Sequence, residues 1–462
     1  MKLRSVAMSK LIFMCLFICF QSVVSEICSN SSENQCFCNQ VTDRKTGLPQ
    51  VRADCSVMNI ESIPDRIESD LNFLDLTGNN IRVLDPKLQK LTSSNLNVLI
   101  LKLNQISKVD SEFFLALPNL SELDLSDNYI TSLDHQIFQN QNNLHRLDLS
   151  YNRIETLPDK IFQSMGKLRD LDLSYNHLGN TLRRAGTFTG RLGVTPNLTH
   201  LGLNGLNITV LPSDAFDGFK KLVSLHLADN NFTDIPNVPY SLEKLDLSLN
   251  RFTYLSAKYL NYPSLKTLEL NGLPLLRSIH HYAFYNLYAL EKLTIRYCPN
   301  LEEFSELAFD VVSKDTSHKH FKFLSLEGNG LRTLNASYKA FFRQMNHVDL
   351  RHNPWRCDCD ILWIQEFSTI LYKQDEIRCN LNPEGTDVYL KNVMDLNHKD
   401  LMECHPEIYG KRSHRVLIII LVVAVVVLMG MIFYLLRYPV DLFRSVRISP
   451  SSPYGPASRT EQ

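Results

Sequence analysis

The sequence lacks a charge excess, and it also lacks the residue patterns on which enzymes rely. Its 48 Lys and Arg residues face 49 Asp and Glu residues, so the formal net charge is −1. Nucleic-acid-binding proteins usually carry a marked positive excess, so a nucleic-acid partner is not expected. No catalytic set of nucleophile, base and acid stands out in the sequence. We therefore expect neither an enzyme nor a bound metal or other cofactor.

Long apolar runs are scarce, with one near each end of the chain. Near the start, Lys2, Arg4 and Lys10 accompany the ten-residue run LIFMCLFICF, and small residues precede Glu26. That run is too short for a membrane helix. The three parts together are typical of a secretory signal peptide, which we place at residues 1–25.

The second run, residues 416–436, predicts a transmembrane helix. Its 21 residues, VLIIILVVAVVVLMGMIFYLL, carry no charge. A helix of that length extends roughly 31 Å, about the thickness of the hydrocarbon core of a bilayer. With the signal peptide, this predicts a single-pass type I protein of the plasma membrane whose residues 26–415 face outward, the last of them, 405–415, as a juxtamembrane linker. Residues 437–462 are expected to form a disordered cytoplasmic tail that is too short for a signalling domain.

The 11 cysteines suit an oxidising compartment. Cys15 and Cys19 belong to the signal peptide, and Cys298 stands alone. The other eight form two groups of four: Cys28, Cys36, Cys38 and Cys55, then Cys357, Cys359, Cys379 and Cys404. Such groups are typical of disulfide frameworks in secreted chains rather than zinc sites, although spacing leaves three pairings open in each group. Six Asn-x-Ser/Thr sequons are expected to carry N-linked glycans on the outer side: Asn30, Asn119, Asn197, Asn207, Asn231 and Asn335.

A repeat fills the middle of the chain. LSELDLSDNYI begins at Leu120, LHRLDLSYNRI at Leu144 and LRDLDLSYNHL at Leu168, so each fits L-x-x-L-x-L-x-x-N-x-L/I. Alternating leucines allow a short strand to point them inward, and an apolar residue at offset 18, such as Phe114 or Phe138, fills the far side. A single coil buries too little to offset the entropy of ordering it, so the coils must stack. About twelve repeats follow this frame, starting at Leu71, Leu96, Leu120, Leu144, Leu168, Leu198, Leu222, Leu242, Leu265, Leu290, Phe321 and Met345.

This pattern resembles the leucine-rich-repeat family, and the resemblance covers residues 28–404. It implies an α/β fold, namely a curved solenoid with a parallel concave sheet, an irregular or short-helical convex side, and disulfide caps. The expected domains are an N-terminal cap (26–70), the repeats (71–353) and a C-terminal cap (354–404). The segment NPWRCDCDILWIQEF contains both tryptophans of the chain and resembles the family's carboxy-terminal cap. By that resemblance, Cys28 pairs with Cys38, Cys36 with Cys55, Cys357 with Cys379 and Cys359 with Cys404.

Cys298 occupies the ninth position of its repeat, where most repeats have asparagine. In the family that the chain resembles, this side chain turns into the coil and bonds the backbone, and cysteine is a known substitute. We expect a buried structural thiol, which a small and weakly polar side chain suits. The alternative is a reactive or intermolecular cysteine. Leucine takes this position at Leu206 and Leu273, where we expect a locally altered turn.

Positions two, three, five, seven and eight of each repeat are predicted to form the concave sheet, the usual binding surface of solenoids. Tyr and Arg are the residue types that carry interface energy, and repeats four to seven vary most at these positions. The predicted ligand-binding residues are His145, Arg146, Tyr151, Arg169, Asp170, Tyr175, His200 and His226. The alternative is an ordinary solvated face.

Three other features allow both a functional and an ordinary interpretation. The acidic column at position five is either a cation or basic-ligand site or a consequence of the repeat consensus LDLS; it consists of Asp75, Asp124, Asp148, Asp172, Asp246, Glu269 and Asp349. The long repeat from Leu168 carries Arg183, Arg184 and Arg191 in an extra segment, which is either a functional loop or a tolerated insertion. The histidines at 280–281 and 318–320 are predicted to be solvated loop residues rather than metal ligands.

Together these features predict a cell-surface recognition or adhesion receptor. Its partner is expected to be an extracellular protein ligand or another cell-surface receptor, bound on the concave sheet. The alternative is a co-receptor or decoy that presents a ligand to a separate signalling receptor, or withholds it. A membrane-tethered enzyme is the third and least favoured hypothesis.

Overall fold

The computed structural model describes residues 36–42, 47–63, 70–87, 95–258, 260–309, 318–381, 389–397 and 427–429. The chain forms two units, Met1–Leu396 and Asn397–Gln462. In the second unit, residues 427–429 are helical and their side chains are exposed. No helix in these ranges is both long and apolar enough to cross a membrane. Several predicted features lie outside the described residues: the signal peptide 1–25, Cys28, Asn30, Cys404, the linker 405–415, the tail 437–462 and nearly all of the span 416–436.

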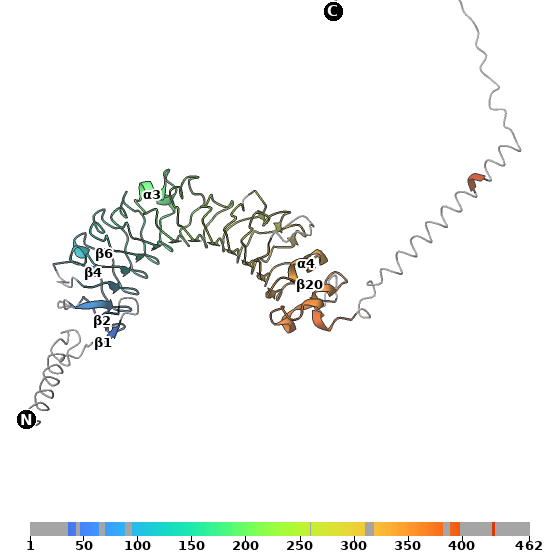
Figure 1. Ribbon diagram of the computed structural model, residues 1–462, viewed down its shortest axis with the longest axis horizontal. Coiled ribbons are helices and arrows are strands. Elements are labelled where there is room, and N and C mark those ends of the chain that lie inside the picture. The colour runs from blue at the N-terminus through green and yellow to red at the C-terminus, as the bar shows by residue number, and fades with distance from the viewer. Residues whose placement is uncertain are drawn as a thin grey trace, which may run out of the picture. The chain divides into compact units, whose positions relative to one another are not determined.

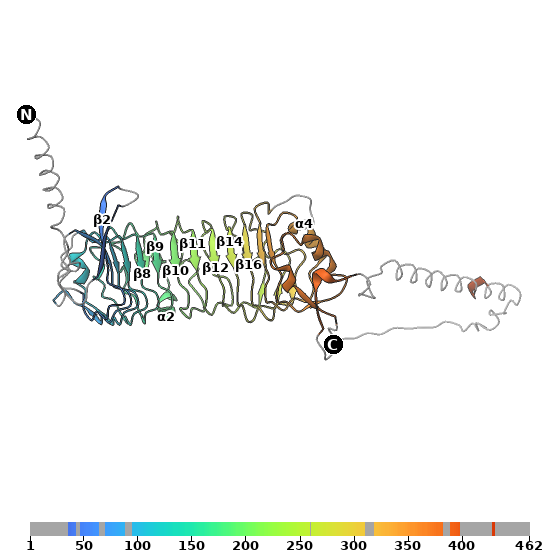
Figure 2. The same ribbon diagram turned by 90° about the horizontal axis from the view of Figure 1, so that it is seen from below.

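The first unit is a curved stack of coils (Figure 1). Its strands lie side by side on the inner face, which Figure 2 views from below. Each of the twelve predicted repeats contributes one strand, and adjacent strands run parallel with equivalent positions paired, as Leu123 is with Leu147. Two strands of the N-terminal cap extend the sheet. In spatial order the described strands of this sheet are β1 (Phe37–Thr42), β2 (Pro49–Asp54), β3 (Leu71–Asp75), β5 (Val98–Ile100), β7 (Glu122–Asp124), β8 (Arg146–Asp148), β9 (Asp170–Asp172), β10 (His200–Gly202), β11 (Ser224–His226), β12 (Lys244–Asp246), β14 (Thr267–Glu269), β16 (Lys292–Thr294), β18 (Phe323–Ser325) and β19 (His347–Asp349).

Smaller sheets, which the sequence analysis did not predict, lie outside this large one. Two-residue strands pair in the loops, and a three-stranded sheet belongs to the C-terminal cap. They are β4 (Val83–Leu84) with β6 (Lys108–Val109); β13 (Tyr254–Leu255), β15 (Ser278–Ile279) and β17 (Glu303–Phe304); and β20 (Trp355–Arg356), β21 (Arg378–Asn380) and β22 (Leu390–Asn392).

The helical part is smaller than the predicted α/β class implies. The described helices are three to six residues long, so the structure is a parallel-sheet solenoid with few helices. Loops that follow the repeat consensus have no room for a longer helix. The helices are η2 (Phe113–Ala116), α2 (Gly179–Leu182), α3 (Phe188–Arg191), η3 (Ala336–Tyr338), α4 (Lys339–Phe342), η4 (Leu362–Phe367), η5 (Gln374–Glu376) and η6 (Val393–Asp395).

The apolar residues of the repeat form one continuous core, as predicted. Leu120 and Leu123 have no exposed surface. On the far side of the coils, the ring centroids of Phe114 and Phe138 lie 6.0 Å apart, and those of Phe138 and Phe162 lie 6.5 Å apart. Each coil therefore packs on its neighbours through both a leucine layer and a phenylalanine spine.

Buried asparagines at position nine join each coil to the one before it. The Nδ2 group of Asn128 donates to the carbonyl oxygen of Leu101 in the preceding coil at 2.9 Å and to that of Leu125 in its own coil at 3.1 Å. Its Oδ1 accepts from the backbone N–H of Ile106 at 2.9 Å. The side chain thus satisfies backbone groups that the turn would otherwise leave buried and unpaired.

Cys298 takes the place of asparagine in this ladder, and the structural interpretation is confirmed. Its thiol has no exposed surface. The Sγ atom accepts from the backbone N–H of Leu273 at 3.4 Å and lies 3.5 Å from the carbonyl oxygen of Leu270, to which the S–H group donates. The carbonyl of Leu270 is equivalent to that of Leu101, the partner of Asn128 in the preceding coil, so one sulfur atom keeps both a donor and an acceptor contact to that coil. Among the described residues Cys298 is the free cysteine, and burial raises the pKa of its thiol to about 11.

Both caps are closed by disulfides. Cys36 is bonded to Cys55, and Cys357 to Cys379; these are two of the pairs that the family resemblance implies. Cys38 and Cys359 are also disulfide-bonded. In the C-terminal cap the indole N–H of Trp355 donates to the carbonyl oxygen of Leu350 at 2.8 Å.

Two expectations about exposure were wrong. Position seven does not face the solvent in every repeat: Ser126 is 1% exposed and its hydroxyl donates to Asp124 Oδ1 at 2.6 Å, whereas 43% of the Lys102 side chain is exposed. His318 is not a solvated loop residue, since it is 1% exposed and its Nε2 lies 3.0 Å from the carbonyl oxygen of Phe284. A ring from Phe309 packs edge-on against it. His280 and His281 are exposed, as predicted.

Candidate ligand-binding surface

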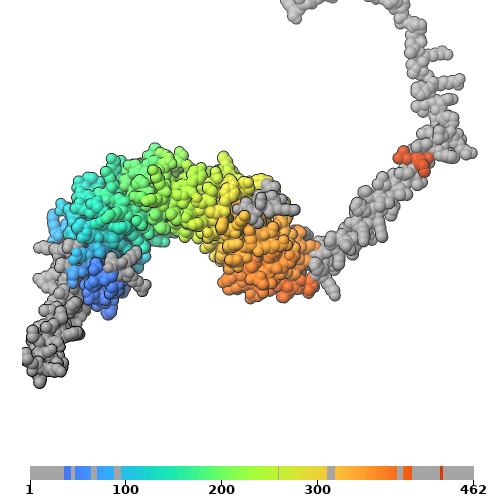
Figure 3. All heavy atoms as spheres, viewed as in Figure 1, coloured from blue at the N-terminus to red at the C-terminus, as the bar shows by residue number. Residues whose placement is uncertain are grey.

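Four neighbouring strands, β8 to β11, carry the predicted ligand-binding residues. Arg146, Asp170 and His200 all occupy position three, and they face each other in register on β8, β9 and β10. His226 ends β11, where it is paired with Gly202 of β10. The inner side of the arc is hollowed in the space-filling view (Figure 3). Arg146, Asp170 and His200 therefore form one row of the concave sheet, and His226 lies at an adjoining position.

The remaining predicted residues lie at the two edges of the same strands. His145 and Arg169 precede β8 and β9, and the backbone N–H of Arg169 donates to the carbonyl oxygen of His145 at 2.8 Å. Both side chains are exposed. Tyr151 and Tyr175 lie beyond the other end of the strands, at position eight. The eight predicted residues thus come from four successive coils, and among their side chains the rings of Tyr151 and Tyr175 are stacked on each other.

Tyr151 and Tyr175 form an aromatic platform. Their ring centroids are 4.3 Å apart, with 15° between the ring planes. The next coil has Gly205 at the same position, and a Cβ there would stand 2.3 Å from the ring of Tyr175. The absence of a side chain allows the ring to lie across this coil. Burial, and then the neighbouring Tyr151, raise the pKa of Tyr175 to about 12, so its phenol is uncharged at physiological pH.

Position eight has an unusual backbone that the stack imposes. Leu103, Tyr151, Tyr175 and Leu249 have φ angles of 52° to 56°, in the left-handed region that costs an ordinary residue roughly 1–2 kcal/mol. Hydrogen bonds between coils hold it, such as the one from the N–H of Tyr151 to the carbonyl oxygen of Ser174 at 2.9 Å. A large side chain here is repeatedly followed by glycine in the next coil. The pairs are Val57 and Gly78, Tyr175 and Gly205, Leu249 and Gly272, and Tyr297 and Gly328.

The arginines of this surface are available for a ligand. Arg146 has Glu122 of β7 as a distant partner, with 3.7 Å between Nη1 and Oε1, and about half of its side chain is exposed. For Arg169, no carboxylate lies within ion-pair distance in the part of the chain that the structure describes. Exposed arginine beside tyrosine is the combination that dominates many protein interfaces.

The acidic column at position five has a local structural role. In Asp124, Asp148 and Asp172 the Oδ1 atom accepts from the backbone N–H two residues later, at 2.9, 3.0 and 2.9 Å, and so closes the turn after the strand. This supports the consensus interpretation over a cation site. Burial, with the carboxylates of Asp124 and Asp172 on either side, raises the pKa of Asp148.

The column is interrupted at β10 and β11. The carboxylate of Asp172 occupies the space beside Gly202, where a Cβ would stand 2.3 Å from its Oδ1. His226 follows in the same row, and burial, then Lys244, lower the pKa of its imidazole. Its Nε2 lies 3.0 Å from Ser224 Oγ. A neutral imidazole thus adjoins a column of carboxylates.

Sequence reasoning missed Gly202 and Gly205, which shape this surface. The signal was the repeat LTHLGLNGLNI, whose two glycines depart from the consensus residues at positions five and eight. The altered turn that we expect at Leu206 and Leu273 also involves residues that depart from the repeat consensus. In both repeats an asparagine at position seven bonds the next coil: Asn204 Oδ1 accepts from the N–H of Ala228 at 2.8 Å, and Asn271 Oδ1 from that of Arg296 at 3.1 Å.

A second polar cluster, also missed, closes the concave sheet at its C-terminal end. Arg351 bonds Asp349 at 2.9 Å, Glu327 at 3.0 Å and Glu376 at 2.8 Å. Its guanidinium also lies 4.6 Å from the ring centroid of Tyr372. The hydrogen bonds that Arg351 donates to Asp349 and Glu376 raise its pKa. Its donors are committed within the protein, so this cluster is structural.

The predicted modification and insertion sites are placed as follows. Asn119 and Asn197 are exposed and immediately precede the first leucine of their repeats. The side chains of Asn207 and Asn231 are hydrogen-bonded to each other across adjacent coils. Glycosylation stays a prediction.

In the inserted segment, Arg183 and Arg184 are exposed. Arg191 has a structural contact, because its Nη1 donates to the carbonyl oxygen of Thr181 at 3.0 Å.

Comparison with known proteins agrees with the geometry. The Leucine rich repeat family model matches residues 69–130 and 118–178, and the model for the BspA type Leucine rich repeat region (6 copies) matches residues 194–315. The chain is a leucine-rich-repeat protein. The matched segments fall within the twelve-coil array described above.

Several solved structures are similar to the chain at low sequence identity. A chain of the octameric complex of Latrophilin 3, Unc5D and FLRT2 is 20% identical over 79% of this chain and 99% of that chain, with a TM-score of 0.47. The functional domain of InlJ from Listeria monocytogenes is 19% identical over 69% and 71%, with a TM-score of 0.44. The chain in the TLR13–ssRNA13 complex is 22% identical over 72% and 54%, with a TM-score of 0.46. Because these TM-scores are below 0.5, nothing about this chain is inferred from them.

Proposed function

We propose that this leucine-rich-repeat protein is a cell-surface recognition or adhesion receptor that binds a protein ligand on its concave face. Residues 26–415 are its extracellular part, and residues 416–436 anchor it in the plasma membrane. The ligand contacts β8 to β11 and the edge residues that flank them. Solenoids of this type commonly use their concave sheet for binding, so the proposal follows from the fold and from the residues on that sheet.

The observation that carries the proposal is the combination of aromatic and basic side chains on two adjacent coils, those that start at Leu144 and Leu168. The stacked rings of Tyr151 and Tyr175 provide a rigid apolar area, with Tyr151 50% exposed. Exposed guanidinium groups of Arg146 and Arg169 lie on the same coils. Aromatic side chains and arginine together supply apolar contact and directed hydrogen bonds at little entropic cost.

A binding screen tests the proposal. Residues 26–415, secreted from animal cells, are screened against a library of extracellular proteins. Each ligand found is then measured against the double variant Arg146→Glu with Arg169→Glu. We expect binding to weaken at least about tenfold, because both charges are reversed in the binding area. The matched control is Lys108→Glu on β6, an exposed lysine outside the concave sheet. Equal binding by the double variant and the control contradicts the proposal.

Adhesion and co-reception are distinguished by cell assays. Expression in non-adherent cells that then aggregate favours the adhesion receptor. Capture of a soluble ligand that gives a signal only when a second receptor is present favours the co-receptor or decoy. Both outcomes use the same concave surface, so the variants above apply to each.

A further inference from the structure

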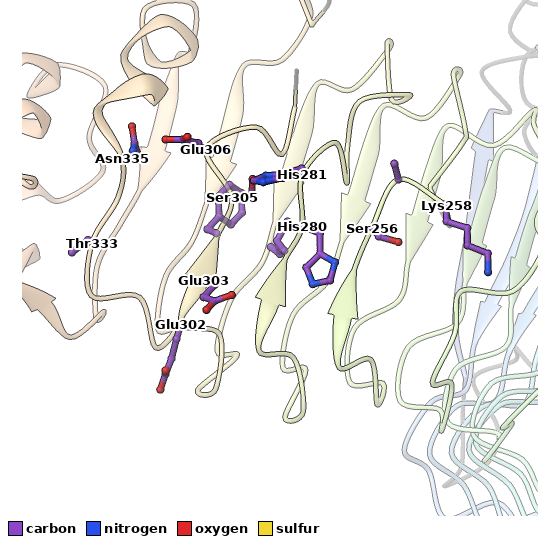
Figure 4. Close-up of a pocket in the computed structure, with 13 residues that line it drawn as sticks. Ser256, Lys258, His280, His281, Glu302, Glu303, Ser305, Glu306, Thr333 and Asn335 are labelled. Carbon is purple, nitrogen blue, oxygen red and sulfur yellow. The ribbon is translucent and has the colours of Figure 1, made fainter. Parts of the chain in front are cut away.

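A groove of about 820 Å³ lies outside the concave sheet, on the coils that follow β12. It runs beside the small sheet of β13, β15 and β17, and Figure 4 shows its residues in a row from Lys258 to Asn335. None of the lining residues belongs to the 14-stranded sheet. Its volume is in the range of pockets that bind small molecules. The ligand-binding surface described above does not use it.

One end of the groove is formed by Asn335, which is the asparagine of a sequon. Asn335 is exposed and precedes η3, and its Oδ1 accepts from the backbone N–H of Ser337 at 2.8 Å. That hydrogen bond holds the amide in one orientation and leaves Nδ2 as the atom that can carry a sugar. An N-linked glycan on Asn335 would therefore start at the wall of the groove.

The lining suits a hydroxyl-rich ligand. Glu302, Glu303 and Glu306 are exposed carboxylates, and each offers two oxygens to accept hydrogen bonds from sugar hydroxyls. Midway along the groove, the imidazole of His280 is stacked on Tyr254, which lies just outside the lining residues, with 4.9 Å between ring centroids and 9° between planes. A flat pair of rings is a surface on which the C–H face of a pyranose packs.

A metal ion is not supported as the occupant. Although His280 and His281 both line the groove, no group of three or more potential metal ligands is found among the described residues. His281 is instead hydrogen-bonded through Nδ1 to Ser305.

We propose that this groove holds the N-linked glycan of Asn335, which lies along the carboxylates towards the Tyr254–His280 rings. A glycan held there is shielded from the glycosidases and glycosyltransferases of the secretory pathway. It therefore keeps its early, oligomannose form, while glycans at freely exposed sites become complex. This inference rests on the proposed function, because N-glycosylation requires the secretory route.

Site-resolved glycopeptide mass spectrometry of the full chain, expressed in mammalian cells, tests the proposal. The reference sites are Asn119 and Asn197, which are exposed and do not line the groove. Asn207 and Asn231 are unsuitable references because their side chains are in contact. We expect the ratio of oligomannose to complex glycans at Asn335 to exceed that at Asn119 severalfold.

Paired variants test whether the groove is the cause. Tyr254→Ala and His280→Ala remove the stacked rings and should lower the oligomannose share at Asn335 to that of Asn119. Tyr240→Ala removes an exposed tyrosine that neither lines the groove nor stacks on His280, and it should leave the share unchanged. Equal processing at Asn335 and Asn119, an unmodified Asn335 beside a modified Asn119, or no effect of either groove variant overturns this inference alone. Absence of glycans at every sequon overturns the secretory route, and with it both proposals.

Discussion

At the scale of single residues, Cys298 shows how one atom can replace an amide. Its Sγ accepts from Leu273 at 3.4 Å, and its pKa is raised to about 11 by burial. A buried thiol with such a pKa is almost fully protonated at pH 8 and does not react. We expect iodoacetamide to label Cys298 only after unfolding, as followed by mass spectrometry.

The variant Cys298→Ser provides the matching genetic test. Its hydroxyl keeps one donor and one acceptor, so the free energy of unfolding should fall by only about 1 kcal/mol. Secretion and monomeric mobility on non-reducing gels should be unchanged. Rapid labelling of the native protein, or loss of a covalent dimer in the variant, is incompatible with a structural thiol.

Asp148 predicts a dependence of stability on pH. Its pKa is raised because it is buried between Asp124 and Asp172, so ionising it disfavours the folded state. In the wild type, the backbone N–H of Ser150 donates to Asp148 Oδ1 at 3.0 Å. Asp148→Asn keeps an Oδ1 atom that can accept this hydrogen bond. Near pH 7 the variant should be more stable by about 0.5 kcal/mol, the usual size of a cross-strand charge effect.

The size of this gain in the free energy of unfolding should depend on pH in a defined way. Wild-type Asp148 is neutral in both the folded and unfolded states below the ordinary pKa of an aspartate. The difference between variant and wild type should therefore vanish as the pH falls to about 3.5. Urea unfolding at several pH values measures it, and a gain that grows on acidification refutes the assignment.

At the scale of the coil, the glycines at position eight determine which side chains can form the aromatic platform. Gly205→Ala places a Cβ 2.3 Å from the Tyr175 ring at a φ of 61°. We expect it to lower the free energy of unfolding by about 2–3 kcal/mol, from the left-handed backbone and the clash together. It should also reduce ligand binding, because Tyr175 is displaced.

Gly186→Ala is the matched control. It also has a positive φ, 103°, but its Cβ meets nothing within 4 Å. Its cost should be limited to the backbone term, about 1–2 kcal/mol, with ligand binding intact. If both variants bind ligand as wild type does, the platform is not part of the binding surface.

The C-terminal end of the sheet depends on one guanidinium group. The carboxylates of Asp349 and Glu327 are 2% and 7% exposed and pair with Arg351. Arg351→Ala leaves Asp349 without a cation and Glu327 with His352 alone, so the free energy of unfolding, measured with guanidinium chloride, should fall by about 3–5 kcal/mol. Lys266→Ala breaks a half-exposed pair with Glu243, which solvent screens, and should cost much less stability than Arg351→Ala. Similar costs for the two variants would falsify the structural role of Arg351.

The Arg351 cluster also makes the stability of the protein depend on pH, and Arg351→Ala should remove part of this dependence. Hydrogen bonds from Arg351, then Lys373, lower the pKa of Glu376. A carboxylate with a lowered folded pKa stabilises the protein above its ordinary pKa and loses that contribution as the pH falls through the lowered value. The acid limb of the wild-type stability curve should therefore be steeper than that of the variant.

The repeating parts of the fold were predictable from the sequence, and the exceptions were not. Period and alternation located every strand of the array, because each coil repeats the same burial pattern. The buried His318 was missed because its partners, Phe284 and Phe309, lie in other segments of the chain. The side-chain bond that buries Ser126 is local, yet a pattern of outward and inward positions does not represent it. The groove near Asn335 is built by coils far apart in sequence, so no motif marks it.

At the scale of the whole molecule, the array separates two kinds of surface. The concave sheet offers Tyr151, Tyr175 and two arginines on adjacent coils, whereas the groove near Asn335 lies elsewhere on the coils. Under the proposed function, ligand recognition belongs to the first surface and glycan retention to the second. Variants in one should therefore leave the other unaffected, since additivity holds for distant sites.

A glycan placed on the concave face tests most directly whether a protein ligand occupies that face. Arg146→Asn with Asp148→Thr creates a sequon on β8 at the middle of the proposed site. Asp134→Asn with Gln136→Thr creates one in an exposed loop outside the sheet. Binding of each screened ligand to cells that display these variants is measured by flow cytometry, with glycan occupancy verified on gels. We expect the glycan on β8 to abolish ligand binding and the loop glycan to leave it unchanged. Full binding to the protein that carries the β8 glycan would contradict it.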